Sequence, residues 1–251
     1  MALEDLGTIN FFKGCFSLIW VIIAIIIGVR IMIKAISLKR KDLVAVGITW
    51  LLMSSGWWGV ATQFITYGFF DYKLSDAQYL AFGNLVLPFT IMIWMYAFVM
   101  IMDLKRGNIL VIAFIIFNTI WLIIVITALT TENIHWIGTV EPEGFDSQHS
   151  AVSDIFTYSA IATFLITGII FSIRSIRIGD PEIKLKAYFL LIAWFLFTIG
   201  AYMDTGLGKP TELSLVLVRL ILILSAIFYY LGWFLPKAIS NRLRSKNTAE
   251  S

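Results

Sequence analysis

An arginine inside an apolar stretch is the residue of this chain whose type and position point most clearly to chemistry. Arg219 lies about 9 Å past the start of its apolar stretch by helical rise, where a charge is costly in a membrane unless it is paired or hydrated. Four arrangements would meet that need. The arginine could form a structural ion pair, extend its side chain to the membrane surface, bind an anionic ligand, or line a proton or transport path. The expected ion-pair partners are carboxylates near the same membrane face: Asp204, Glu212 and Asp154.

Two amides and several aromatic residues lie at a depth similar to that of the arginine. Asn84 and Gln63 could bond neighbouring helices for packing, or could join the arginine in a small polar cluster. Trp57, Trp58 and Tyr202 suit either an interfacial aromatic belt or the wall of an apolar ligand pocket. Together with Arg219, these five residues are the candidate ligand-binding set.

Seven apolar stretches, each about twenty residues long, must position these side chains. Hydrophobic residues make up 59% of the 251-residue chain and charged residues only 14%, and the mean hydropathy is +0.88. Because roughly 20 apolar residues cross a bilayer as a helix, we predict an all-α membrane protein with a seven-transmembrane-helix bundle in residues 1–237. A short basic tail, 238–251, follows. The predicted spans are 15–36, 43–68, 79–102, 109–128, 152–173, 185–204 and 212–235.

The distribution of lysine and arginine predicts the orientation of the bundle. Fifteen of the nineteen cations fall in the loops and tail on one side, whereas only Lys13, Lys73 and Lys209 fall on the other. The positive-inside rule therefore puts the N-terminus outside and the C-terminus in the cytoplasm. The net charge of +3 is explained by this topology, so we expect no nucleic-acid partner. The acidic outer segment 130–150 is expected to be a solvated loop.

An internal similarity appears when the chain is shifted by 144 residues against itself. The shift sets Trp50 on Trp194 and Gly56 on Gly200, and it sets Arg30 on Arg174. If this match is not a coincidence of apolar composition, spans one to three and five to seven form a 3+1+3 parallel repeat around span four. Binding sites in such proteins tend to lie between the repeats.

Three segments in the last third of the chain resemble the seven-helix membrane regions at the N-termini of some prokaryotic sensor histidine kinases, and their stand-alone archaeal relatives. They are the 180–182 loop leading into 185–194, the triplet 218–220, and the exit segment 230–237. The resemblance implies a sensory or scaffolding membrane module. In the kinases a cytoplasmic catalytic region follows the last helix, whereas residues 238–251 are too few for one, so we expect a separate signalling partner.

Several chemistries lack the residues that they need. The last span has no lysine at its centre for a retinal Schiff base, and the single cysteine, Cys15, allows no disulfide or cysteine-based metal site. His135 and His149 both fall in the outer loop, and no phosphate-binding glycine loop or serine nucleophile motif is present. We therefore expect no metal, no cofactor and no catalytic residues.

The leading hypothesis is a non-enzymatic, receptor-like sensor in the cell membrane. It would bind a small ligand from outside in a pocket in the outer half of the bundle, and it would signal to a cytoplasmic protein. The first alternative is a small-solute transporter built from the two repeats, although the inner halves of the spans are nearly all apolar. The second alternative is a membrane-embedded enzyme using the outer carboxylates.

Overall fold

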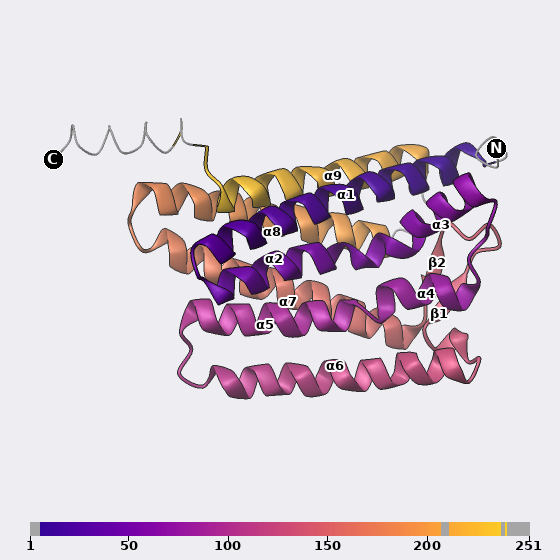
Figure 1. Cartoon of the computed structure of the whole chain (residues 1–251), viewed down its shortest axis with the longest axis horizontal. Helices are drawn as coiled ribbons and strands as arrows, with labels where there is room; N and C mark the ends of the chain where they lie inside the picture. The colour runs from indigo at the N-terminus through magenta and orange to yellow at the C-terminus, as the bar shows by residue number, and fades with distance from the viewer. Residues whose placement is uncertain (1–5, 207–210, 237–238, 240–251) are drawn as a thin grey trace. The chain divides into compact units, whose positions relative to one another are not determined.

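The computed structural model describes residues 6–206, 211–236 and 239, and these residues are almost entirely helical (Figure 1). A short antiparallel hairpin in the segment between α6 and α7 is the exception. The elements in chain order are α1 (Thr8–Ser37), α2 (Lys41–Met53), η2 (Ser54–Trp57), α3 (Trp58–Phe70), α4 (Asp76–Asn84), α5 (Leu87–Met102), α6 (Gly107–Thr130), η3 (Ile134–Trp136), β1 (Gly138–Val140), β2 (Ser147–His149), α7 (Ala151–Ile176), α8 (Pro181–Gly206) and α9 (Glu212–Trp233).

Seven helical segments of the described chain are long and apolar enough to cross a membrane, and they coincide with the seven predicted spans. They are Thr8–Ser37, Lys41–Phe70, Asp76–Met102, Gly107–Thr130, Ala151–Ile176, Pro181–Thr205 and Leu213–Trp233. The protein is therefore a multi-pass, all-α membrane protein. The first helix begins at Thr8, seven residues earlier than predicted, and so includes Asn10 and Lys13, whose polar side chains have partners described below.

Two of the spans are interrupted, each for a local chemical reason. The second span tightens into the 3-10 turn η2, where the Ser54 hydroxyl donates to the Leu51 carbonyl at 2.8 Å and accepts from the Trp58 indole at 3.0 Å. The third span breaks between α4 and α5, because Pro88 has no N–H to donate to the carbonyl of Asn84, the last residue of α4. The interruptions divide these spans into shorter helices.

The helices form two compact units, and the boundary between the units falls inside α7 and α9. The first unit comprises residues 1–160 and 209–219, and the second comprises 161–208 and 220–251. In the first unit, α1 packs against α2 and α3, α2 packs against α5, and α5 packs against α6, so that these helices lie side by side (Figure 1).

Glycines bring α1 and α2 into close contact in the first unit. A Cβ atom added to Gly28 would lie 2.8 Å from the carbonyl oxygen of Gly47, and one added to Gly47 would lie 2.8 Å from the carbonyl oxygen of Gly28. Small residues that allow two backbones to approach in this way are typical of helix contacts in membranes. Nearer the N-terminus of α1, Trp20 packs edge-on against both Trp50 and Trp57.

The second unit is organised around Trp194 on α8. Its ring is stacked with Phe164 of α7 at a centroid distance of 6.4 Å, and it meets Tyr229 of α9 edge-on at 5.5 Å. Gly200 of α8 packs closely against Leu222 of α9. Trp194 and Tyr229 are fully buried, so this aromatic cluster is the core of the unit.

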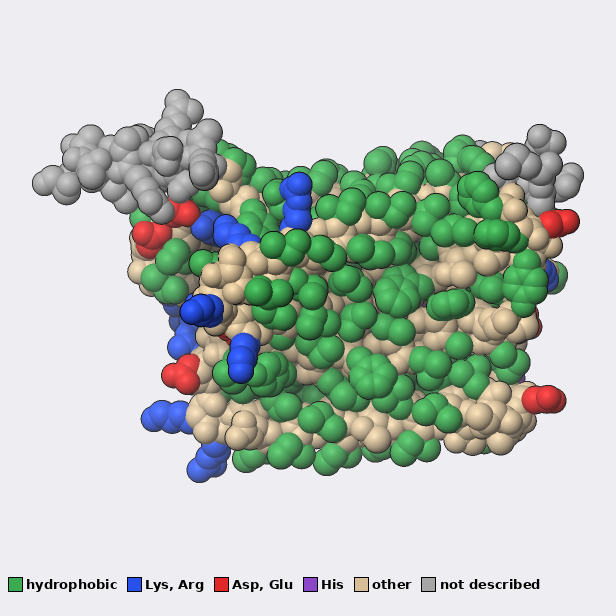
Figure 2. All heavy atoms as spheres, in the orientation of Figure 1, with side chains coloured by type: hydrophobic (Ala, Val, Ile, Leu, Met, Phe, Trp, Pro, Cys, Tyr) green, Lys and Arg blue, Asp and Glu red, His purple; other side chains and the backbone are tan. Residues whose placement is uncertain are grey.

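The surface of the first unit has the chemistry of a membrane-spanning bundle. Figure 2 shows hydrophobic side chains covering α1, α2, α5 and α6 between their ends, with Lys and Arg side chains gathered where α1 turns into α2 and α5 into α6. The exposed apolar side chains of α6 include Ile109, Ile112, Ile116, Ile120 and Ile123. We call the end of the first unit that carries the α1–α2 and α5–α6 loops the basic end. The opposite end carries β1 and β2, and we call it the hairpin end.

The acidic loop between α6 and α7 is folded, although we predicted a solvated loop. Strands β1 and β2 pair in antiparallel register, with Gly138 opposite His149 and Val140 opposite Ser147. The turn between them, residues 141–146, is closed by a bond from the Glu141 N–H to the Asp146 carbonyl at 2.9 Å. Phe145, in this turn, is buried against Tyr67 of α3, which explains why the loop packs onto the helices.

Candidate functional site

Arg219 is buried in the first unit, with only 4% of its surface exposed. Its guanidinium carbon lies 5.9 Å from the centroid of the Trp57 ring, within the range of a cation–π interaction. Trp57 in turn meets Trp20 edge-on at 5.7 Å. The first turns of α9 and the turn η2 therefore position a buried cation against a tryptophan cluster.

The three predicted carboxylate partners of Arg219 have different positions. Asp154 contacts His149 instead, with its carboxylate 3.5 Å from the imidazole Nδ1. Asp204 belongs to the second unit, and the side chain of Glu212 lies outside the described part of the chain. Of the three predicted partners, Asp154 is therefore paired with His149 at the start of α7.

The two predicted amides make bonds that are structural in character. Gln63 is fully buried, and its Oε1 accepts from the backbone N–H of Leu74 at 2.9 Å, which fixes the loop between α3 and α4. Asn84 is half-buried, and its Nδ2 donates to the carbonyl of Leu80 one turn earlier in α4, at 2.9 Å. The Asn84 amide therefore bonds within α4, and a role beside Arg219 stays a prediction.

The remaining predicted residues differ in exposure. Trp58 is half-buried and donates to Ser54 in the preceding turn, so its indole N–H is used within its own span. Tyr202 is 59% exposed on α8, and its place in the wall of a ligand pocket stays a prediction. A tyrosine in that position suits an interfacial belt, because its ring is amphipathic. Among the aromatic candidates, Trp57 contacts Arg219 directly.

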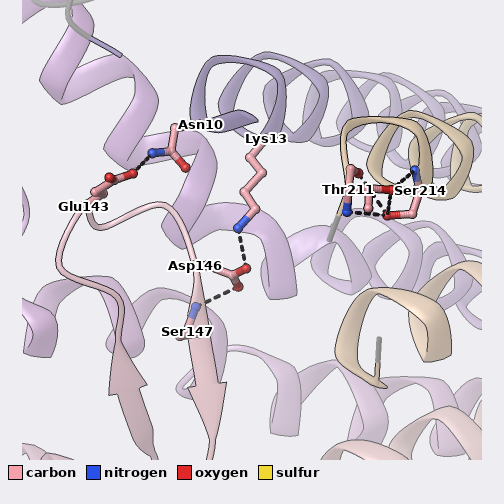
Figure 3. Close-up of polar contacts among 7 residues, drawn as sticks. All are labelled: Asn10, Lys13, Glu143, Asp146, Ser147, Thr211 and Ser214. Carbon is pink, nitrogen blue, oxygen red and sulfur yellow. Dashed lines mark hydrogen bonds and ion pairs between the residues drawn. The ribbon is translucent and has the colours of Figure 1, made fainter. Parts of the chain in front are cut away.

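A polar cluster that the sequence did not predict lies at the hairpin end of the first unit (Figure 3). The ammonium group of Lys13 is 2.5 Å from the carboxylate of Asp146, and Asn10 donates through its Nδ2 to the carboxylate of Glu143. A third contact is made by Lys73, which donates to the carbonyl of Pro142. We call residues 141–146 the acidic turn, since it supplies every acceptor in these contacts.

The burial of this cluster is asymmetric. The side chain of Lys13 is 8% exposed, whereas that of Asp146 is 38% exposed, so the carboxylate lies between the ammonium and the solvent. One and two helical turns further along the same face of α1 are Ser17 and Trp20, both buried. The inward face of α1 therefore changes from polar to aromatic as it enters the bundle.

The spacing of these residues was a signal available in the sequence. Asn10, Lys13, Ser17 and Trp20 recur at intervals of three and four residues, which places them on one face of a helix. Their acidic partners lie 133 residues away in both cases, and no local pattern reveals contacts over that separation. In the described part of the chain, no group of three or more His, Cys, Asp or Glu residues is arranged to hold a metal ion.

The fold and the sequence together define the class, a multi-pass helical membrane protein. No family model, curated protein or solved structure matches the chain in the comparisons with known proteins.

Proposed function

We propose that this protein is a receptor-like membrane sensor that binds a small ligand at the hairpin end and signals to a separate cytoplasmic protein. The observation that carries the proposal is the burial of Arg219 against Trp57. A buried guanidinium offers several hydrogen-bond donors in a fixed plane, and it suits recognition of a planar anionic group. The adjoining indoles of Trp57 and Trp20 would contact the apolar part of such a ligand.

The orientation that we propose puts the hairpin end outside the cell and the basic end in the cytoplasm. Short loops rich in Lys and Arg are retained in the cytoplasm, and in the first unit such residues cluster at the basic end: Lys34, Lys39, Arg40, Lys41, Lys105 and Arg106. The cell membrane is the location that fits a ligand arriving from outside. The basic end would then be the surface that contacts a cytoplasmic signalling partner.

The distribution of buried charge favours binding over transport. In the described part of the chain, the buried charged residues are Lys13 and Arg219, and both lie within a few turns of the outer start of their helices. Further along, Thr49 on α2 and Ser172 on α7 carry small hydroxyl groups, and the buried amide of Asn118 near the middle of α6 bonds the Phe114 carbonyl of its own helix. A transporter needs polar groups along the whole crossing, so the inner halves give it little support.

We also infer an internal duplication of the first two helices. Trp20 of α1 contacts Trp50 of α2 with ring centroids 6.2 Å apart, and Phe164 of α7 contacts Trp194 of α8 at 6.4 Å. Residue 20 corresponds to residue 164, and residue 50 to residue 194, at the same offset of 144 that aligns the sequences. An aromatic pair that recurs at one offset in two helix pairs supports a parallel repeat.

Ligand binding at Arg219 can be tested by thermal unfolding of the purified full chain with a panel of small carboxylates and amino acids. We expect at least one compound to stabilise the wild-type protein and to have no effect on Arg219→Gln, because the charge that it contacts is lost. Arg106→Gln, which removes an exposed cation at the basic end, is the matched control and should respond as the wild type does. A panel without any stabilising compound, or a response retained by Arg219→Gln, would contradict the proposal.

The same compound also separates a sensor from a transporter. Reconstituted in vesicles, the protein should bind the compound without accumulating it inside. Uptake against a protein-free control would favour a transporter built from the two repeats, because such proteins bind their substrates between repeated halves.

A further inference from the structure

The acidic turn and α1 match each other in spacing. Asn10 and Lys13 are three residues apart on α1, and their partners Glu143 and Asp146 are three residues apart in the turn (Figure 3). We propose that this face of the first unit is a dicarboxylate-binding site, which the two carboxylates of the acidic turn occupy at rest. A free aliphatic dicarboxylate would take their place when the turn moves away.

The burial of Lys13 is the first argument. Its ammonium is covered by the carboxylate of Asp146, which is itself partly open to solvent. A buried cation without a counter-ion is strongly unfavourable, so an anion that takes the place of Asp146 when the turn leaves is favoured. Because the carboxylate is the more exposed partner, the position that Asp146 now holds is open to a dissolved carboxylate once the turn moves.

Two buried donors of the first unit, on Ser17 and Gln63, have no hydrogen-bond partner among the described residues. Ser17, one turn deeper on the same face of α1, is fully buried, and its hydroxyl has no hydrogen-bond partner among the described residues. The Nε2 of Gln63 is likewise buried without a partner in the described chain. The Leu74 N–H can only donate, so the atom of the Gln63 amide that faces it is Oε1. The Nε2 donor of Gln63 therefore remains for another acceptor.

The position of Gly144 connects Gln63 to the acidic turn. A Cβ atom added to Gly144 would lie 3.7 Å from Nε2 of Gln63 and 3.2 Å from the Lys73 side chain. The amide of Gln63 therefore faces the same turn that holds Asp146 and Glu143. The groups that face the turn are hydrogen-bond donors, and a surface of this kind selects an anion.

The acidic turn is attached to the rest of the first unit by few contacts. Its polar contacts with the rest of the first unit, in the described part of the chain, are those made by Asn10 and Lys13 of α1 and by Lys73 of the loop between α3 and α4. The buried ring of Phe145 adds an apolar anchor. The β1–β2 pairing lies within the hairpin itself, so the turn can keep its shape while these few contacts are exchanged.

The spacing of the contacts defines the ligand class. Residues three apart on a helix have Cβ atoms about 5–6 Å apart, a separation that a short aliphatic dicarboxylate can span with one carboxylate on Asn10 and the other on Lys13. This inference rests on the proposed function only in placing ligand entry at the hairpin end. Its residues are distinct from Arg219 and Trp57.

Binding of succinate to the full chain, measured by calorimetry, tests the site. Asp146→Asn removes the internal competitor, so it should bind succinate at least ~10-fold more tightly than the wild type, because the competent state is more populated. Lys73→Ala, which removes only the donor to Pro142, should shift the affinity in the same direction. Glu141→Gln is the matched control, because Glu141 contributes backbone bonds to the turn, and it should leave the affinity unchanged.

Loss of the site is tested in a background that avoids an unpaired buried charge. The double variant Lys13→Gln/Asp146→Asn replaces the ion pair by two amides, and it should bind succinate at least ~10-fold more weakly than Asp146→Asn. Succinamide, which has the same length and no charge, should not bind Asp146→Asn. Equal succinate affinities of the wild type and Asp146→Asn, or of Asp146→Asn and the double variant, would overturn the proposal.

A third measurement separates this inference from the proposed function. Arg219→Gln should leave succinate binding by the Asp146→Asn protein unchanged, since Arg219 is not part of this site. If no compound loses its binding in Arg219→Gln while succinate binding depends on Lys13, the proposed role of Arg219 fails and the dicarboxylate site is supported. If a compound requires Arg219 while succinate binds none of the variants, the dicarboxylate site fails alone.

Discussion

Arg219 lies over the indole ring of Trp57, with the guanidinium carbon 5.9 Å from the ring centroid, although the two residues are 162 positions apart in the chain. The contact joins the first turns of α9 to η2 within the first unit. It places a buried cation beside the tryptophan pair Trp57 and Trp20.

The coupling between Arg219 and Trp57 can be measured with a double-mutant cycle. We expect Arg219→Leu and Trp57→Leu each to destabilise the protein, and the double variant to cost about 1–2 kcal/mol less than their sum, as for a desolvated cation–π pair. Unfolding in detergent micelles provides the free energies.

Trp58 is the matched control for that cycle. It is the next residue in the chain, but its indole bonds Ser54. Combined with Arg219→Leu, Trp58→Leu should therefore be additive. Equal coupling of Arg219 to both tryptophans would show that the effect is general packing.

The backbone of the acidic turn requires glycine at position 144. Gly144 has φ +75°, in the left-handed region, and an added Cβ would lie 3.2 Å from Lys73. We expect Gly144→Ala to destabilise the turn by about 1–2 kcal/mol and to accelerate hydrogen exchange in residues 138–149. Gly56→Ala has nothing within 4 Å of the added Cβ and should leave that exchange unchanged. Unaltered exchange in Gly144→Ala would mean that the turn tolerates the strain.

The proposed orientation predicts which positions can be labelled from outside the cell. In a Cys15→Ser background, a cysteine at position 73 or 209 should react with a membrane-impermeant maleimide added outside. A cysteine at position 40 or 243 should react only after the membrane is opened, and a tag after residue 251 should be cytoplasmic. The reverse pattern would invert the bundle and place the hairpin end, with its acidic turn, in the cytoplasm.

The duplication predicts a superposition that an experimental structure can check. Helices α1 and α2 should overlay on α7 and α8, with Trp50 on Trp194 and Gly56 on Gly200. The ring of Phe164 should then take the place of Trp20. Helix pairs that cross at clearly different angles would show that the 144-residue offset reflects composition alone.

The seven spans could be predicted because each depends on a local property, a run of apolar residues long enough to cross a bilayer. The break of the third span at Pro88 has a local cause as well, since proline acts on the carbonyl four residues before it. The start of α1 was placed too late, because Asn10 and Lys13 looked like residues that end an apolar span. Their helical position depends on acceptors in the distant acidic turn.

The candidate site was predicted less completely, and the reasons are physical. The sequence correctly marked Arg219 and Trp57 as residues of one region, but it assigned Asn84 and Tyr202 to the same site. Asn84 instead bonds Leu80 in its own helix, and Tyr202 is exposed on α8. Depth in a span can be read from residue number, whereas the direction of a side chain around the helix depends on which neighbour covers it.

Composition and periodicity alone determined that this chain is a seven-span helical membrane protein, because hydrocarbon solvent imposes the length and apolarity of each span. Only the tertiary structure decided that Lys13 meets Asp146 and that Arg219 meets Trp57. Those contacts join segments more than a hundred residues apart, so they form only when folding brings these segments together.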